Sequence, residues 1–178
     1  MQLRVFKVDS EPGKALRDWW VGLENNKGDR AALRRSGTIT EVIFIPAFHD
    51  LCVALQRCGD FGPKPERLPA VAGLLAQVKS DPKTARGGDR PSLPVQMASD
   101  RKSGAGPHVS DLRFRRLLQC RTVEELFPSL RRVIRLLDNR VDIYSLAESV
   151  YFWDAYFWGD RIRKEWAYDY YGILRERN

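Results

Sequence analysis

Residues 122–137 read TVEELFPSLRRVIRLL, and this stretch decides the fold class. Its apolar residues recur every three or four positions from Val123 to Leu137, which is the spacing of one face of an α-helix. Thr122 with Glu125 fits a capping box, in which a hydroxyl and a carboxylate satisfy backbone N–H groups at the helix start. The stretch therefore predicts an amphipathic helix that turns its apolar side to a core.

This helix also carries arginines on the side away from its apolar stripe, namely Arg131, Arg132 and Arg135. Cations near a helix C-terminus complement its dipole, which explains part of their placement. The preceding predicted helix, residues 110–120, has an apolar face flanked by Arg113, Arg115 and Arg116. We expect the two helices to lie side by side, so that their arginines form a groove for phosphates.

Helices are also predicted on both sides of this pair, and clear strand alternation is nearly absent. The expected helices span residues 12–23, 30–35, 46–59, 68–78, 143–157 and a final segment that starts at Gly159-Asp160. Asp29, Thr38 and Asp142 are expected N-caps. Pro46 is expected to open a helix, because proline lacks only an N–H that has no partner in the first helical turn.

Residues 79–107 are rich in Gly, Pro, Ser and charge, with only a weak apolar cluster. This composition predicts a flexible connector that could hold one short helix. The expected organisation is all-α, with two small helical bundles: an N-terminal bundle at 1–78, the connector at 79–107 and a C-terminal bundle at 108–178.

The overall composition favours a polyanionic partner. The 178 residues are 43% hydrophobic, enough for a core, and carry a formal net charge of +7. Nucleic acid is the first expectation and an acidic membrane surface the second. No apolar stretch approaches the ~20 residues needed to cross a bilayer, and the N-terminus lacks a signal-peptide core, so we expect a cytoplasmic protein without a membrane partner.

The final helix begins with an unusual run of cations, Arg161, Arg163 and Lys164. A helix N-terminus is partially positive, so this arrangement favours an incoming phosphate. Helical spacing also predicts a strip on which unpaired bases could stack, formed by Arg161, Lys164, Tyr168 and Tyr171. The alternative is that the tyrosines pack at a helix crossing and the cations are merely solvated.

A third basic cluster, on the short helix 30–35, consists of Arg30, Arg34 and Arg35. Arginine predominates over lysine in all these clusters, and its planar head favours bidentate phosphate contacts. No cluster shows the Asn, Gln and Arg pattern of a helix that reads base edges, so we expect binding without sequence preference.

Catalytic signals are weak throughout the sequence. His49 lies three residues before Cys52, but nothing nearby activates the thiol, so we expect a half-buried structural histidine and reduced cysteines at Cys52, Cys58 and Cys120. The carboxylates Glu124 and Glu125 are explained by the helix dipole. We therefore expect no catalytic residue, no metal site and no cofactor.

Several short segments occur together in an order that is specific, although each is weak alone. They are Trp19-Trp20 with Leu23, and residues 30–35, 45–49, 71–78, 110–118, 130–132 and 158–161 onward. On these segments the chain resembles CasB, the small subunit of the type I-E CRISPR Cascade complex. It departs from that family at residues 92–98 and in its extended start, residues 1–11.

The resemblance implies a non-catalytic all-α subunit, present twice per complex, that stabilises the R-loop and the displaced DNA strand. The implied partners are a second copy, the backbone subunits, the large subunit, CRISPR RNA and target DNA, with no small-molecule substrate. By motif position it implicates first Arg34, Arg35, Arg113, Arg131, Arg132, Arg161 and Arg163, and next Arg30, Arg116, Arg135 and Lys164.

Two other functions stay open at this stage. One is a free-standing helical DNA-binding regulator that uses residues 110–137 as a helix-turn-helix pair, although the connection between its helices is short. The other is a metal-dependent nuclease. The predicted helix 143–157 is apolar nearly all round, which is typical of a buried helix or an interface.

Overall fold

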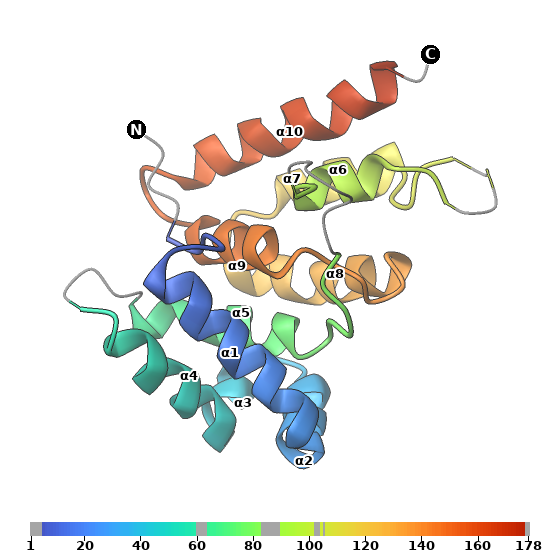
Figure 1. Ribbon diagram of the computed structural model, residues 1–178. Coiled ribbons are helices and arrows are strands. Elements are labelled where there is room, and N and C mark those ends of the chain that lie inside the picture. The colour runs from blue at the N-terminus through green and yellow to red at the C-terminus, as the bar shows by residue number, and fades with distance from the viewer. Residues whose placement is uncertain (1–4, 60–63, 83–89, 102–103, 105, 177–178) are drawn as a thin grey trace. The chain divides into compact units, whose positions relative to one another are not determined.

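The computed structural model describes residues 5–59, 64–82, 90–101, 104 and 106–176. Within these ranges every regular element is a helix (Figure 1). The same ranges contain two isolated β-bridges, which lie outside the helices. The predicted all-α class is confirmed. The parts of the expected connector at 83–89, 102–103 and 105 lie outside the described residues.

The helices group into two compact units. The first comprises Met1–Gln77 with Ile143–Tyr151, and the second comprises Val78–Asp142 with Phe152–Asn178. The predicted division at 1–78, 79–107 and 108–178 stays a prediction. By contacts, residues 79–107 group with the second unit, and the helix that starts at Ile143 groups with the first.

The first unit is centred on α5, Leu68–Leu75, in which every residue is buried. This segment carries no charged side chain, and a helix that is apolar all round requires cover on all sides. The other helices of this unit are α1 (Glu11–Asn25), α2 (Lys27–Arg35), α3 (Ile39–Ile43), α4 (Pro46–Gln56), the short 3-10 helix η1 (Pro65–Arg67) and most of α9 (Ile143–Phe152). Helices α2, α3 and α4 all pack against α5, and α1 packs against α2 and α4.

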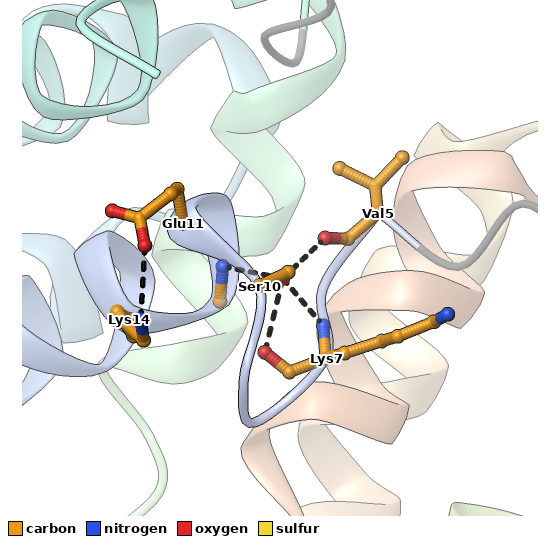
Figure 2. A network of polar contacts seen from close by, with 6 residues as sticks. Val5, Lys7, Ser10, Glu11 and Lys14 are labelled. Carbon is orange, nitrogen blue, oxygen red and sulfur yellow. Dashed lines mark hydrogen bonds and ion pairs between the residues drawn. The ribbon is translucent and has the colours of Figure 1, made fainter.

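Helix α1 begins at a tight turn organised by Ser10 (Figure 2). The Ser10 hydroxyl oxygen accepts hydrogen bonds from the N–H groups of Lys7 at 3.0 Å and Gly13 at 3.1 Å, and the hydroxyl donates to the Val5 carbonyl at 2.9 Å. A Cβ atom at position 13 would clash with the Lys7 carbonyl oxygen, so only glycine fits there. This cap holds Val5 and Lys7 at the start of α1.

The N-caps of α2 and α3 test two sequence predictions. Asp29 was expected to cap the second helix, but Asn26 does so, because its side chain accepts from the Asp29 N–H at 3.3 Å and the helix starts three residues earlier than expected. At α3 the Thr38 hydroxyl accepts from the Glu41 N–H at 3.2 Å, as predicted. Pro46 opens α4, as predicted.

The second unit contains α6 (Leu93–Ala98), α7 (Asp111–Gln119), α8 (Val123–Leu136) and α10 (Gly159–Glu176). Helix α6 packs along α10 (Figure 1). The core contains stacked aromatic rings, since Phe114 lies over Tyr170 with 3.8 Å between ring centroids and 7° between ring planes. The Tyr170 hydroxyl donates to the Val109 carbonyl at 2.6 Å, and burial raises its pKa to about 12.

Helix α8 begins as the sequence predicted. The Thr122 hydroxyl accepts from the Glu125 N–H at 3.2 Å, and the Glu125 carboxylate accepts from the Arg121 N–H at 2.7 Å. The reciprocal bond therefore reaches one residue further back than in the standard capping box.

Asp142, expected as an N-cap, accepts a hydrogen bond from Arg90 Nε to its Oδ2 at 2.5 Å and is almost fully buried. Arg90 also pairs with Asp81, so one guanidinium links two carboxylates of the second unit. This double ion pair ties Arg90 of the predicted connector to residues on either side of it in the chain.

The predicted helix 143–157 is too long, because α9 ends at Phe152. A turn follows, and α10 starts at Gly159, where a Cβ atom would clash with the Trp153 carbonyl oxygen. Tyr156 and Phe157 project from this turn with 92% and 82% of their surface exposed. Of the two alternatives that the sequence left open, burial describes α9, whose residues are mostly buried, and an interface stays a prediction for these two exposed rings.

Candidate nucleic-acid interface

Helices α7 and α8 enclose a groove of about 380 Å³ in the second unit, which we call the arginine groove. Its lining comprises Arg113, Arg116, Leu117, Ser129, Arg132, Val133, Arg135 and Leu136. Four of the predicted binding residues thus meet at one site. The expectation that α7 and α8 bring their arginines together in a groove agrees with this geometry.

Helix periodicity explains the arrangement of charge and apolar surface. Arg113 and Arg116 are three residues apart on α7, as are Arg132 and Arg135 on α8, so each pair shares one face of its helix. Arg113, Arg116, Arg132 and Arg135 are all exposed, whereas Leu117 and Val133 are 2% and 3% exposed. The groove therefore has cationic rims above an apolar floor.

The four guanidinium groups have no carboxylate counterpart within ion-pair distance among the residues that the structure describes. The neighbouring Arg115 differs, because its Nε donates to the Asp111 carboxylate at 2.9 Å. Arg116 and Arg135 lie in the last turns of their helices, where the dipole favours a cation. These four exposed cations are therefore open to an anion from solution.

Arg131, which the resemblance ranked with Arg132, does not line this groove. Its guanidinium lies 5.8 Å from the centre of the Phe127 ring, and the residue is half-buried. A cation–π contact of this kind stabilises the fold whether or not nucleic acid is bound. Adjacent residues on a helix point about 100° apart, which separates Arg131 from Arg132.

The cluster on α2 belongs to the first unit. Arg30 Nε donates to the Ala76 carbonyl at 3.3 Å, which satisfies a carbonyl at the end of α5. Burial, and then the neighbouring charge of Arg34, lower the pKa of Arg30. Arg34 and Arg35 are exposed in the last turn of α2. Of the three, Arg30 has a structural role that the sequence did not suggest.

The cationic start of α10 is partly neutralised by its own carboxylates. Arg161 Nε donates to Glu165 at 3.0 Å, and its guanidinium lies 5.4 Å from the centre of the Trp158 ring. Arg163 donates a hydrogen bond to Asp160 and thereby lowers the pKa of that carboxyl. The repulsion between the helix dipole and the cations at the start of α10 is thus offset locally, because the Asp160 carboxylate lies in the first helical turn.

The predicted aromatic strip on α10 is only partly present. Tyr168 is 80% exposed, whereas the Tyr171 hydroxyl donates to Asp111 Oδ1 at 2.7 Å and its ring packs edge-on against Phe114. For Tyr171 the alternative of packing at a helix crossing is therefore correct. Of the two tyrosines in the predicted strip, Tyr168 is the one with an open ring face on which a base could stack.

Comparison with known families decides which family the chain belongs to. The family described as CRISPR-associated protein Cse2 matches residues 29–171. The chain belongs to the Cse2 family. It is a small subunit of the type I-E Cascade, the multi-subunit CRISPR complex. Searches of curated proteins and of solved structures found no match.

The Cse2 match includes all the predicted binding residues, from Arg30 to Lys164, and leaves out Trp19-Trp20 of the resemblance. The arginine groove lies entirely within the matched range.

Sequence reasoning missed the groove's other lining residues, Leu117, Ser129, Val133 and Leu136. A signal was available for two of them, because Ser129 lies three residues before Arg132 and Leu136 lies four residues after it, on the same side of the helix.

Histidine and cysteine positions in this Cse2 chain give no sign of a catalytic pair. His49 is exposed, not half-buried as expected, and its Nε2 lies 2.8 Å from the Ile43 carbonyl oxygen. The thiols of Cys52, Cys58 and Cys120 are free, and burial raises the pKa of each, which disfavours the reactive thiolate. Cys52 is buried and the other two are half-buried.

The described residues hold neither a cluster of metal ligands nor a helix suited to a membrane. No group of three or more His, Cys, Asp or Glu side chains in that part of the chain is placed to hold a metal ion. None of the helices there combines the length and the apolar character that a membrane span requires.

Arg163, one of the predicted binding residues, makes several contacts within the fold. Its side chain is only 16% exposed, it donates to the Trp153 carbonyl at 3.1 Å and to Asp160 at 2.7 Å, and it lies 5.5 Å from the centre of the Trp153 ring. Removing a partly buried cation with these bonds leaves the Trp153 carbonyl without its donor.

We therefore expect Arg163→Ala to lower the free energy of unfolding by about 1–3 kcal/mol, the usual cost of an unsatisfied buried group. Lys164→Ala is the matched control, since Lys164 is exposed and its loss should change stability by less than about 0.5 kcal/mol. Urea unfolding of both variants measures the difference. Equal stability of the two variants would show that Arg163 does not hold the turn.

Proposed function

We propose that this Cse2 subunit is a non-catalytic, cytoplasmic component that binds nucleic acid without sequence preference. In this role it stabilises the R-loop, including the displaced DNA strand. The arginine groove is the main contact, with Arg34 and Arg35 on α2 and Arg161 and Lys164 on α10 as further contacts. In the complex it would meet a second copy of itself, the backbone subunits, the large subunit, the CRISPR RNA and the target DNA.

The convergence of Arg113, Arg116, Arg132 and Arg135 on one groove is the observation that carries this proposal. Guanidinium groups bind phosphate oxygens through paired hydrogen bonds, and four of them match a polyanion better than a single small anion. The groove offers no Asn or Gln with which to read base edges. In a guide-RNA complex, base pairing with the guide supplies the sequence specificity, so the protein needs only charge and shape.

The test is a salt titration of the purified chain with fluorescent single-stranded DNA of two unrelated sequences. Each phosphate bound by an arginine should contribute about 0.7 to the negative slope of log affinity against log salt, so four bound phosphates predict a slope near −3. Both sequences should give the same affinity and slope. A flat salt dependence would contradict the proposal.

The same titration separates the two competing functions. A free-standing regulator would retain one particular duplex at a salt concentration that releases all others. A nuclease would shorten the labelled strand when Mg²⁺ or Mn²⁺ is added, and a single carboxylate substitution would abolish that cleavage. Sequence-indifferent binding of an intact strand supports the proposed role.

A further inference from the structure

We propose that the arginine groove holds one unpaired nucleotide, with its base inserted against the apolar floor and its phosphates at the arginine rims. This inference rests on the proposed function and deepens it, because charge alone requires no base in the groove. It assigns the site to single-stranded nucleic acid, since the bases of a duplex are paired and stacked and cannot enter a pocket.

The first argument is the shape of the site. A rim of cations without a cavity would hold only the phosphate backbone, whereas this groove encloses about 380 Å³. That volume lies at the lower end of the range of about 300–1,000 Å³ found for pockets that enclose small molecules. It is large enough for one base and its sugar.

The second argument is the chemistry of the floor. Leu117 and Val133 are nearly buried and Leu136 is half-buried, so the bottom of the groove is aliphatic. The face of a base is apolar and gains dispersion attraction there, while guanidinium planes on the rims can stack on it from the sides. A carboxylate or phosphate gains nothing from such a floor.

The third argument concerns Ser129, the one polar uncharged residue in the lining. A hydroxyl can donate or accept, so it can bond to the edge of any of the four bases. Any of the four bases can therefore enter the groove, because Ser129 does not discriminate between them. This agrees with binding that does not depend on sequence.

An acidic peptide is the other chemistry that arginines bind. The aliphatic floor could also take a leucine side chain, but the net charge of +7 and the four guanidinium groups without a carboxylate among the described residues favour a repeating phosphate chain. A nucleotide supplies the anion and the flat apolar group in one covalent unit.

The experiment compares three ligands with the full chain by fluorescence polarisation at one salt concentration. They are a short thymidine oligonucleotide, an abasic strand with the same number of phosphates, and an oligoglutamate of the same charge. We expect the abasic strand to bind about tenfold more weakly than the thymidine strand, in line with the usual worth of one stacked base. Oligoglutamate should not displace the thymidine strand.

A variant then locates the effect. Ser129→Leu partly fills the groove without adding a ring on which a base could stack, and it keeps all four arginines. It should therefore lower thymidine-strand affinity towards the abasic level and leave the salt slope unchanged, because the phosphate contacts remain. Ser129→Ile is the second variant, in case the first does not fold. Thermal unfolding checks both.

The outcomes distinguish this inference from the proposed function. Equal affinity of the thymidine and abasic strands for the unmodified chain would overturn base insertion while leaving phosphate binding intact. Displacement by oligoglutamate as effective as that by unlabelled DNA would also overturn it and would assign the groove to acidic peptides. Failure of every strand to bind would instead refute the proposed function.

Discussion

The double variant Arg132→Glu, Arg135→Glu should bind single-stranded DNA at least about 100-fold more weakly than the unmodified chain, since each of the two charge-assisted hydrogen bonds that it removes is worth about 1.5–3 kcal/mol. Both arginines line the groove from α8, and both are exposed. Reversal removes two cations and places two carboxylates beside the bound phosphates. The slope of log affinity against log salt should also become flatter by about 0.7 for each phosphate that the variant no longer neutralises.

The matched control is Arg57→Glu, Arg175→Glu, which makes the same change in net charge with exposed arginines outside every predicted cluster. We expect this control to weaken binding less than about tenfold, because screening reduces the effect of distant exposed charges. Circular dichroism and thermal unfolding of both variants establish that each is folded. A similar loss of affinity in the two variants would mean that net charge, and not the groove, governs binding.

Assembled Cascade gives the corresponding functional measurement. Complexes that carry the groove variant should form R-loops that dissociate faster than those of the unmodified complex, because the groove no longer holds the displaced strand. Guide RNA content should stay unchanged. An R-loop lifetime equal to that of the unmodified complex would separate binding by the groove from the proposed role.

Trp153→Ala should cause the largest loss of stability of any single truncation considered, about 3–5 kcal/mol in the free energy of unfolding. The Trp153 side chain is fully buried, its Nε1 donates to the Cys120 carbonyl at 2.9 Å, and its ring meets Trp166 edge-on with 4.8 Å between centroids. Truncation creates a cavity and removes the donor from Cys120. It also removes the ring beneath the Arg163 guanidinium.

Urea unfolding followed by near-ultraviolet circular dichroism measures this loss. Tyr156→Ala is the control, because Tyr156 is a large aromatic residue in the same turn but is 92% exposed. Its truncation should change the free energy of unfolding by less than about 0.5 kcal/mol. If Trp153→Ala cost no more than this control, the second unit would not depend on the aromatic core described above.

The fold could be predicted where local rules dominate. Thr122 caps α8 and Pro46 opens α4 as expected, because caps and proline act within a few residues of themselves. The cap of α2 was misplaced to Asp29, since Asn26 and Asp29 are both good caps and spacing alone does not choose between them. Helix α9 was predicted to be too long, because the apolar residues of the sequence continue past Phe152 into the turn.

The candidate site was predictable in part for a related reason. The periodicity of α7 and α8 places arginines on faces away from the core, and their short connection makes the helices neighbours. Periodicity does not reveal which arginines make contacts within the fold. Arg30, Arg131 and Arg163 were grouped with the others, yet they contact Ala76, Phe127 and Trp153 respectively.

The sequence by itself determined the all-α class, most helix boundaries, the basic character and the family resemblance, because these follow from composition, spacing and short motifs. Only the tertiary structure decided that Arg113, Arg116, Arg132 and Arg135 share one groove over an aliphatic floor. The physical reason is that a helical face is set by residues a few positions apart, whereas a groove requires two faces to meet. Packing between helices likewise decides which arginines contact the fold itself, as Arg30 contacts the Ala76 carbonyl 46 residues further along the chain.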